Sequence, residues 1–362
     1  MTAWDERVDA RLERIRLAGQ WRAPRDVDPR DATAPVSFAS NDYLGLSQHP
    51  AVIAAAHDAL DRYGTGSGSA RLIVGSRPIH GELENALAEW RGTERAVLFP
   101  TGFAANLGVL STLGTADALI LSDELNHASI IDGCRLAHAD VEVYRHADVE
   151  HVEKLLVQAA GRPAIIVSDS VFSMDGDVAP VDELGEVANR FDALLILDEA
   201  HAVLGPEPDL TGATSLRVGT LSKTLGALGG FVAGPARYCD LLVNRARPYI
   251  FTTAATPADT AAAAAALAIL RSTKGDDLKA TLRRHVAAVR PGHPSPIIPI
   301  VIGDEDAAIA ASAALLERGL LVPAIRPPTV APGTSRLRVA LSAAHTDAQV
   351  AALVEALRHL AA

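Results

Sequence analysis

The hydrophobic positions of the chain form short continuous runs that alternate with stretches of helical periodicity. The first set of strand-like runs follows residue 50 and covers residues 96–100, 118–123, 141–146, 164–173, 193–201, 216–223 and 229–234. Continuous apolar strands separated by helices are typical of a mostly parallel sheet that is covered on both faces. The pattern therefore predicts an α/β fold with a mostly parallel central sheet in a large domain.

A second, shorter alternation predicts a smaller C-terminal α/β domain. It follows an alanine-rich helix, and its expected elements are strands at 296–303, 320–325 and 335–342, a helix over 306–318 and a last helix from Thr346. We expect three parts along the chain: an N-terminal helix and segment over 1–48, a large domain over 49–272 and a small domain over 273–362. The proline-rich stretch 290–296 is expected near the hinge between the two domains.

The N-terminal stretch has apolar residues on one helical face. Trp4, Val8, Leu12 and Ile15 recur at steps of four, four and three residues, which is the spacing of an amphipathic helix. We expect this helix to pack on another surface, such as a second subunit.

Composition and charge argue against several classes of protein. The 362 residues carry a formal net charge of −11, whereas nucleic-acid binding normally needs a basic face. No apolar segment is long and hydrophobic enough to span a bilayer, and the charged N-terminus lacks the apolar core of a signal peptide. Cys134 and Cys239 lie too far apart for a metal-binding knuckle. These features predict a soluble, cytoplasmic protein whose partners are not a metal, a membrane or a nucleic acid.

The lysine content singles out one position. Of the 33 basic residues only four are lysines, and three of these, Lys154, Lys274 and Lys279, lie in polar, helix-like surroundings. Lys223 instead lies in LSKTLGALGG, among small residues and glycines at the end of a predicted strand. A solvated lysine does not need such a setting, which makes Lys223 the first candidate for chemistry.

Other polar residues also follow predicted strands, where ligands of doubly wound sheets bind. They are Asp198, His201, Ser173 and His127. A lysine, a carboxylate and two imidazoles form the set that pyridoxal 5'-phosphate requires. The lysine forms a Schiff base, the carboxylate keeps the pyridine nitrogen protonated, and an imidazole can stack on the ring. The turn TGFAANLG at 101–108 follows a strand and opens a helix, so its backbone N–H groups can bind the phosphate.

Taken singly, several of these motifs are ambiguous. DEAH at 198–201 also occurs in NTPases, but the chain lacks the G-x-x-x-x-G-K-[ST] motif that such enzymes need. GTGSGS at 64–69 is better interpreted as a glycine-rich turn, because it matches neither a dinucleotide-binding nor a nucleophile-elbow motif. A lone His127 is more often structural, and Arg336 and Arg338 alone could form an exposed strand face. Arg336 stays undecided, because we expect it to face away from Arg338 in a regular strand.

Ten motifs together resemble the α-oxoamine synthase family of fold-type-I pyridoxal phosphate enzymes, and they occur in the order of that family. They are SNDYLGLSQHP (40–50), YGTGSGSARLIVG (63–75), HGELENALAEW (80–90), TGFAANLG (101–108), SDELNHASIIDGCRL (122–136), DSVFSMDGDVAP (169–180), LDEAHAVLG (197–205), TLSKTLGALGG (220–230), YIFTTAATPA (249–258) and RPPTVAPGTSRLR (326–338). The match covers nearly the whole chain and implies an aminotransferase-like fold. The alternative from another class is a non-catalytic relative of that fold, but a dead pocket would have no reason to keep the lysine, the aspartate and both histidines.

The resemblance implies cofactor-binding roles for individual residues. Lys223 would hold pyridoxal 5'-phosphate covalently, Asp198 would pair with its pyridine nitrogen, and His127 would stack on its ring. The phenolic oxygen would be bonded by His201 and Ser173, and the phosphate by the amides of Gly102 and Phe103 and the hydroxyl of Thr220. Thr252 or Thr253 would reach the phosphate of a neighbouring subunit, which implies a homodimer.

The resemblance also bears on the substrates. Asn41 and Arg338 resemble groups that bind the amino-acid carboxylate, and Arg22 falls near the acyl substrate. The family includes glycine users with acetyl or succinyl groups, serine users with long acyl groups and alanine users with a pimeloyl thioester. Arg22 and the motif at 326–338 favour decarboxylating condensation of L-alanine with pimeloyl-CoA or a pimeloyl carrier protein, as in biotin biosynthesis. The chain departs from the family pattern in the loop 202–215, which concerns the acyl site rather than the cofactor residues.

Overall fold

The centre of the fold is a seven-stranded sheet with the strand order β2-β8-β7-β6-β5-β3-β4. The computed structural model describes residues 1–28, 31, 33–159, 161–205 and 207–360. The strands of this sheet are β2 (Arg95–Phe99), β3 (Leu119–Asp123), β4 (Asp140–Tyr144), β5 (Ala164–Asp169), β6 (Leu194–Asp198), β7 (Ser215–Thr220) and β8 (Gly230–Gly234). All neighbouring strands are parallel except that β8 runs antiparallel to β2 and β7. The prediction of a mostly parallel central sheet is confirmed.

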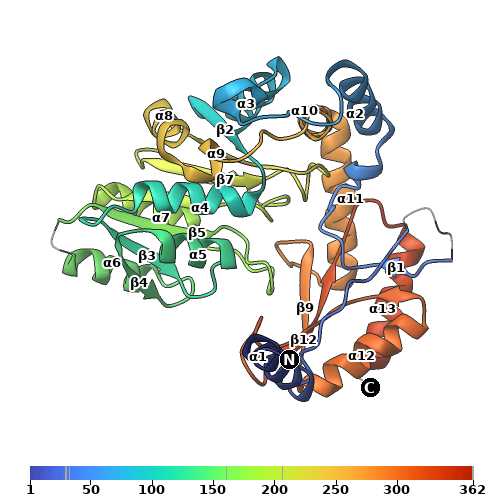
Figure 1. The fold of residues 1–362 in the computed structure, drawn as a ribbon. Helices are drawn as coiled ribbons and strands as arrows, with labels where there is room; N and C mark the ends of the chain where they lie inside the picture. The colour runs from blue at the N-terminus through green and yellow to red at the C-terminus, as the bar shows by residue number, and fades with distance from the viewer. Residues whose placement is uncertain (29–30, 32, 160, 206, 361–362) are drawn as a thin grey trace.

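Helices cover both faces of this sheet (Figure 1). One face packs on α4 (Gly102–Leu113), α5 (Ala128–Leu136), α8 (Ala236–Arg245) and α9 (Arg247–Ile250). The other packs on α6 (Val149–Gln158), α7 (Val181–Arg190), α3 (Pro78–Arg91) and α10 (Pro257–Leu270). Within β3, Ile120 faces the first set while Leu119 and Leu121 face the second, because successive strand residues point to opposite faces. Burial on both faces explains why these strands read as continuous apolar runs.

A second lobe contains the C-terminal part of the chain. Its sheet is antiparallel in the order β11-β12-β9, with β9 (Ile297–Gly303), β11 (Ala324–Ile325) and β12 (Ser335–Ala340). Its helices are α11 (Thr273–Val289), α12 (Glu305–Glu317) and α13 (Asp347–Leu360). Helix α11, which contains the helix-like surroundings expected for Lys274 and Lys279, extends from the upper lobe into the lower one (Figure 1).

The N-terminal segment joins this second lobe. Strand β1 (Val36–Ser37) pairs in parallel with β10 (Leu320–Leu321), so that Val36 lies opposite Leu320. Both chain termini lie on the same lower lobe (Figure 1). The three-part division along the chain stays a prediction, but the segment before residue 49 is physically attached to the C-terminal lobe.

The predicted N-terminal helix is present as α1 (Ala3–Leu17). It begins with a capping box, because the Thr2 hydroxyl accepts from the Asp5 backbone N–H and the Asp5 carboxylate accepts from the Thr2 backbone N–H. None of its residues is buried, and Trp4 is 71% exposed. Its packing on a second subunit therefore stays a prediction. The remaining helical elements are η1 (Leu46–Gln48), α2 (Pro50–Tyr63) and η2 (Arg71–Gly75).

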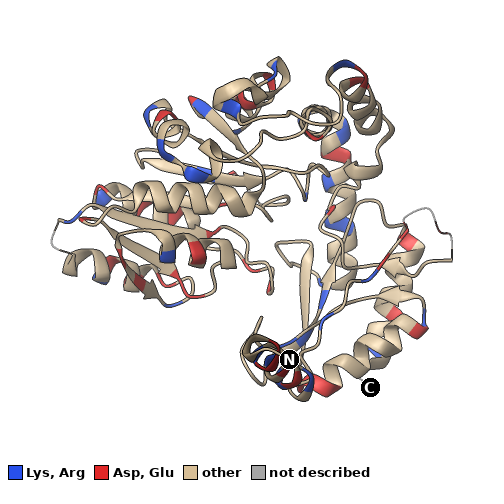
Figure 2. Ribbon diagram, viewed as in Figure 1, with Lys and Arg blue, Asp and Glu red and all other residues tan. Residues whose placement is uncertain are grey.

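Charged residues of both signs are interspersed along the helices of both lobes (Figure 2). Some pair one turn apart, such as Arg16 with Glu13 and Arg135 with Asp132. In the part of the chain that the structure describes, no helix is both long enough and apolar enough to cross a membrane.

Candidate active site

The ends of the central strands converge on one cleft. Asp169 and Asp198 end the neighbouring strands β5 and β6 at the same register, and Lys223 lies three residues beyond the end of β7. The carboxyl ends of parallel strands meet at one edge of a sheet, which is where α/β proteins bind ligands. The cleft has a volume of about 220 Å³ and is lined by Thr101, Gly102, Phe103, His127, Ser129, Asp169, Asp198, Ala200, His201, Thr220, Ser222 and Lys223. The predicted lysine, carboxylate, imidazoles and phosphate-binding turn thus lie together.

One end of the cleft is the start of α4. Gly102 and Phe103 occupy the first turn, where backbone N–H groups have no acceptor within the helix. A Cβ on Gly102 would lie 3.1 Å from the Thr220 Cβ, and a Cβ on Gly230 would lie 2.4 Å from the Gly102 nitrogen. Glycine at both positions therefore lets β8, the start of α4 and Thr220 come together. The result is a cup of N–H groups and a hydroxyl that suits a phosphate.

The turn that carries Lys223 is held by its own backbone. Leu221 N–H donates to the Gly229 carbonyl at 3.0 Å, and Gly226 N–H donates to the Lys223 carbonyl at 3.0 Å. Gly226 has a positive φ of 63°, and a Cβ there would lie 2.4 Å from the Ser47 nitrogen. Only glycine accommodates both constraints, so the glycines around Lys223 serve to present the lysine at a fixed place.

Lys223 meets the first of the two imidazoles directly. Its Nζ lies 2.8 Å from His201 Nε2. Burial lowers the pKa of Lys223, while the carboxylates of Asp198 and Asp169 oppose that shift. Burial also places the pKa of His201 well below its usual value, and the positive charge of Lys223 lowers it further. His201 is therefore neutral at neutral pH, and its Nε2 accepts a hydrogen bond from the lysine.

A chain of hydrogen bonds continues from His201 to the second lobe. Because Nε2 accepts, His201 Nδ1 donates to the Tyr43 oxygen at 2.6 Å, and the Tyr43 hydroxyl donates to Asn41 Oδ1 at 3.1 Å. Arg338 Nη2 donates to the same Asn41 oxygen at 3.2 Å. Burial raises the pKa of Tyr43 well above its usual value, which keeps its hydroxyl protonated. The predicted pair Asn41 and Arg338 is thus brought together and linked to Lys223.

The two arginines of β12 both face the segment after β5. Arg338 Nε donates to the Ser173 carbonyl at 2.6 Å, and Arg336 forms an ion pair with Asp175. The expectation that Arg336 faces away from Arg338 is wrong, because residues two apart in a strand share a face. Asp175 neutralises Arg336, whereas Arg338 has only neutral partners among the described residues. The role predicted for the Ser173 hydroxyl stays a prediction, since Ser173 is not among the described residues that line the cleft.

The predicted residues Thr252, Thr253 and Arg22 border other cavities of the chain. Thr252 and Thr253 border a separate small cavity together with Arg71. Arg22 lies beside Thr329, with its Nη2 at 3.5 Å from the threonine hydroxyl, in a cavity of about 290 Å³. The N-terminal arginine and the motif at 326–338, which both suggested the acyl substrate, therefore meet in space.

The family model for class I and II aminotransferases matches residues 33–357. The chain belongs to the class I and II aminotransferase family. Within it, the chain is 47% identical to an 8-amino-7-oxononanoate synthase from Anaeromyxobacter dehalogenans, with 97% of this chain and 94% of that protein covered. It is 48% identical to one from Methylobacterium sp. (strain 4-46), with 98% of this chain and 94% of that protein covered. The α-oxoamine synthase resemblance of the motifs is confirmed.

Solved structures of this family have the same fold. A serine palmitoyltransferase from S. paucimobilis with bound PLP-myriocin superposes with a TM-score of 0.91 at 29% identity and covers 99% of this chain and 98% of that one. An 8-amino-7-oxononanoate synthase from Francisella tularensis superposes with a TM-score of 0.75 at 28% identity and covers 90% of this chain and 96% of that one.

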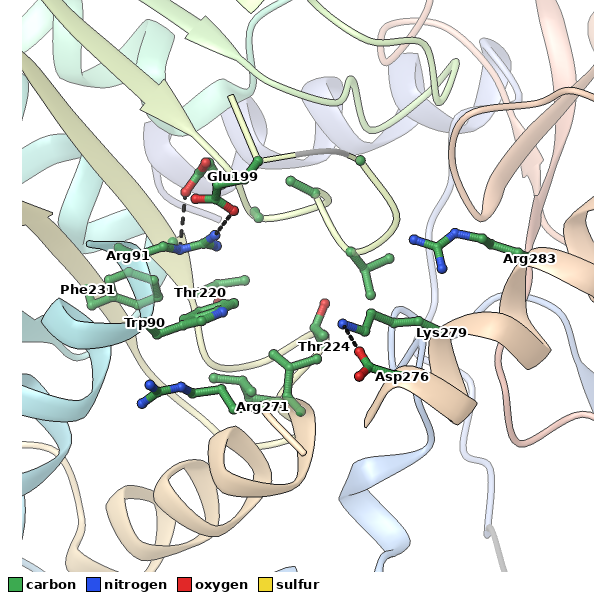
Figure 3. Close-up of a pocket in the computed structure, with 18 residues that line it drawn as sticks. Trp90, Arg91, Glu199, Thr220, Thr224, Phe231, Arg271, Asp276, Lys279 and Arg283 are labelled. Carbon is green, nitrogen blue, oxygen red and sulfur yellow. Dashed lines mark ion pairs between the residues drawn. The ribbon is translucent and has the colours of Figure 1, made fainter. Parts of the chain in front are cut away.

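In this aminotransferase-family chain, the turn after β6 is anchored by a buried ion network. Glu199, with a side chain that is 2% exposed, accepts from Arg217 Nε at 3.0 Å and lies 3.3 Å from Arg91 Nε. Figure 3 shows Arg91 directed at Glu199 in the wall of a cavity of about 360 Å³, which shares Ala200 with the cleft. Glu207 of the loop 202–215 pairs with the same two arginines, whereas residue 206 lies outside the described residues. The network fixes the backbone next to Asp198.

We expect Glu199→Gln to destabilise the protein by about 3–5 kcal/mol, because two buried arginines lose their shared carboxylate. The measurement is urea unfolding of the cofactor-free chain. Glu207→Gln is the matched control, since the Glu207 side chain is 60% exposed and the loss should stay under about 1 kcal/mol. Equal losses in the two variants would show that Glu199 does not anchor this turn.

Proposed function

We propose that the chain is a pyridoxal phosphate-dependent acyltransferase. It condenses L-alanine with a pimeloyl thioester, with loss of carbon dioxide, to give 8-amino-7-oxononanoate in biotin biosynthesis. The observation that carries the proposal is the convergence of Lys223 and Asp198 on one cleft whose hydrogen-bond chain ends at Asn41 and Arg338. The identity of 47–48% to proteins that carry this name supports it.

The residues of the cleft fit pyridoxal 5'-phosphate. The first-turn amides of α4 and the Thr220 hydroxyl would hold the phosphate, Asp198 the pyridine nitrogen and Lys223 the aldehyde carbon. His127 and Ala200 also line the cleft and would contact the ring. When bound, the cofactor supplies an electron sink for the negative charge that develops at the amino-acid Cα. Asp198 carries the negative charge that stabilises a protonated pyridine nitrogen.

The chain's own residues bind the amino acid and move its proton. Arg338 and Asn41 would hold the substrate carboxylate, because Arg338 is the arginine of β12 that has no carboxylate partner among the described residues. Lys223 Nζ would take the Cα proton, and its lowered pKa increases the unprotonated fraction that can do so. Tyr43 binds His201 Nδ1, which leaves His201 Nε2 facing the lysine. Carbon–carbon bond formation then releases the thiolate of the thioester, the carboxylate leaves as carbon dioxide, and a proton returns to Cα.

A second candidate is another member of the α-oxoamine synthases. The serine palmitoyltransferase from S. paucimobilis superposes more closely than the synthase from Francisella tularensis. Both structures are below 30% identical to this chain, so the comparison reflects the shared backbone more than the acyl site. We therefore give more weight to the relatives at 47–48% identity.

The substrate pair is tested by release of free thiol. L-alanine, glycine and L-serine are each combined with acetyl, succinyl, pimeloyl and palmitoyl thioesters, and we expect the highest kcat/KM with alanine and the pimeloyl group. Residual glycine turnover is compatible with the proposal, because one methyl group is worth only about 1–3 kcal/mol in discrimination. A clearly higher kcat/KM for another acyl group with every amino acid would refute the pimeloyl assignment. An acetyl or succinyl preference with glycine would identify a 2-amino-3-ketobutyrate ligase or a 5-aminolevulinate synthase.

We also propose that the enzyme works as a homodimer in which Thr252 or Thr253 reaches the partner's phosphate. Both threonines lie away from the cleft of their own chain, and large apolar side chains nearby are exposed, including Phe251 at 70% and Ile73 at 73%. Burial of such side chains by a second copy would be favourable.

We expect partial recovery of activity when Lys223→Ala subunits are mixed with subunits that carry both Thr252→Ala and Thr253→Ala. Each parent is inactive, but a hybrid dimer contains one site that lacks both defects. Activity is measured after subunit exchange has been verified by native mass spectrometry. If exchange occurs without recovery, each site is complete within one chain.

A further inference from the structure

Two buried polar side chains behind the cleft join Asp198 to His127. Asn106 lies on α4 and Ser129 in the first turn of α5, and each is 1% exposed. Asn106 Nδ2 lies 2.6 Å from Asp198 Oδ2 and 2.8 Å from Ser129 Oγ. Ser129 Oγ in turn lies 2.7 Å from His127 Nδ1. The four side chains form one continuous chain of hydrogen bonds.

A backbone group fixes the direction of this chain. The Ser129 N–H can only donate, and it donates to His127 Nδ1 at 3.2 Å. Nδ1 therefore carries no proton, so the Ser129 hydroxyl also donates to it. Ser129 Oγ then accepts from Asn106, whose other amide hydrogen goes to the Asp198 carboxylate. The imidazole of His127 is left with its proton on Nε2.

The packing of α4 on α5 does not require these polar groups. Asn106 Oδ1 is buried and has no hydrogen-bond partner among the described residues, which is a cost that an apolar side chain would avoid. The helices already approach closely at Gly133, where a Cβ would lie 2.8 Å from Leu110 Cδ1 and 3.1 Å from the Asn106 carbonyl. The amide and the hydroxyl are therefore better explained by what they donate to.

The groups around His127 also affect whether its imidazole is neutral or protonated. Asp198 and Lys223 line the same cleft and act on its ring electrostatically, Asp169 accepts its backbone N–H at 2.7 Å, and the Phe103 ring lies edge-on to it. Burial lowers the pKa of His127, Asp198 opposes that effect, and Lys223 lowers the pKa further. The surroundings and the hydrogen-bond chain both favour a neutral imidazole.

We propose that Asn106 and Ser129 are positioning residues that hold His127 as the neutral tautomer protonated on Nε2 and fix the orientation of the Asp198 carboxylate. One carboxylate oxygen accepts from Asn106 and the other from the Ala200 N–H at 2.9 Å. The catalytic benefit rests on the proposed function. A neutral imidazole would contact a protonated pyridine ring without charge repulsion. A positively charged imidazolium would instead lower the pKa of the pyridine nitrogen and so oppose the protonated form that Asp198 stabilises.

The state of His127 is measured by long-range ¹H–¹⁵N correlation spectra of the full chain labelled in histidine, with and without pyridoxal 5'-phosphate. The spectrum of His127→Gln assigns the signals. We expect an unprotonated Nδ1 and a protonated Nε2 that do not change between about pH 6 and about pH 8. A proton on Nδ1, or titration near the ordinary histidine pKa of about 6.5, would overturn the proposal. The test needs no substrate, so its outcome is independent of which acyl group the enzyme uses.

Variants of Ser129, with a Ser168 control, distinguish a positioning role of the Ser129 hydroxyl from a role in packing. Ser129→Ala should raise the pKa of His127, because the neutral form loses a hydrogen-bond donor. Ser129→Thr should restore the wild-type spectrum. The control Ser168→Ala removes another buried hydroxyl, which bonds the Asp169 carbonyl, and should leave His127 unchanged. A folded Ser129→Ala protein with wild-type His127 signals would contradict the proposal, and the wild-type spectrum alone decides it if that variant does not fold.

Discussion

Replacing Lys223 by alanine is expected to lower kcat by a factor on the order of 10⁴, because in the proposed function this one side chain provides both covalent attachment of the cofactor and the base at Cα. The matched control is Lys279→Ala, since the Lys279 amine pairs with Asp276 at 2.9 Å outside the cleft and should have no part in turnover. Steady-state kinetics of the two variants gives the comparison.

Borohydride reduction provides a readout that does not depend on turnover. In the wild-type protein it should attach the cofactor permanently to the peptide that contains Lys223, as seen by peptide mass mapping. Lys223→Ala should lose this modification. If Lys223→Ala retains borohydride-fixed cofactor at wild-type occupancy, the lysine has been assigned wrongly.

The pH dependence of the wild-type enzyme follows from the same side chain. The amine acts as a base only when it is unprotonated, and burial lowers its pKa. The rising limb of kcat against pH should therefore lie below the ordinary lysine pKa of about 10.4. A limb at the ordinary value would mean that the buried setting of Lys223 has no effect on the chemistry.

Replacing Asp198 by asparagine is expected to leave cofactor binding nearly intact while kcat falls by about 10²–10³-fold, the usual effect of removing one preorganised electrostatic group. In the proposed function, the pyridine nitrogen would lose the negative charge that keeps it protonated. The direct readout is the exchange of the Cα deuterium of labelled L-alanine with solvent in the absence of thioester.

The neighbouring carboxyl group provides the control for Asp198. Burial, and then the charge of Asp198, raise the pKa of Asp169 well above its usual range. Asp169→Asn keeps an oxygen that can accept the His127 backbone N–H and should slow Cα exchange much less than Asp198→Asn. A loss in Asp198→Asn that is confined to cofactor affinity would contradict the role of this residue.

The sequence predicted the elements whose local pattern reflects burial. Apart from the exposed edge strand β4, the strands β2 to β8 are buried along most of their length, and Asp198 and Lys223 could be recognised because they follow such strands. Strand β1 could not be predicted, because two residues leave no periodic pattern and its partner β10 lies far along the chain. Helix α11 was anticipated only as the polar, helix-like surroundings of Lys274 and Lys279, because the polar stretch at its start shows no clear apolar period.

The site residues that the sequence missed depend on tertiary contacts. Tyr43 lies in the motif next to Asn41, but its hydroxyl meets His201 only because the chain brings together positions 158 residues apart. Asn106 and Ser129 lie in quoted motifs as well, yet their link exists only where α4 packs on α5. Motifs thus showed which segments matter, and the structure was needed to show which side chains act on one another.

The proposed decarboxylating condensation is tested most directly by following the carboxyl carbon of the amino acid. L-alanine labelled with ¹³C in the carboxyl group is incubated with the protein, pyridoxal 5'-phosphate and a pimeloyl thioester. We expect labelled carbon dioxide, free thiol and unlabelled 8-amino-7-oxononanoate in equal amounts. Formation of labelled pyruvate without carbon dioxide, as expected of a transaminating member of the same family, would contradict it.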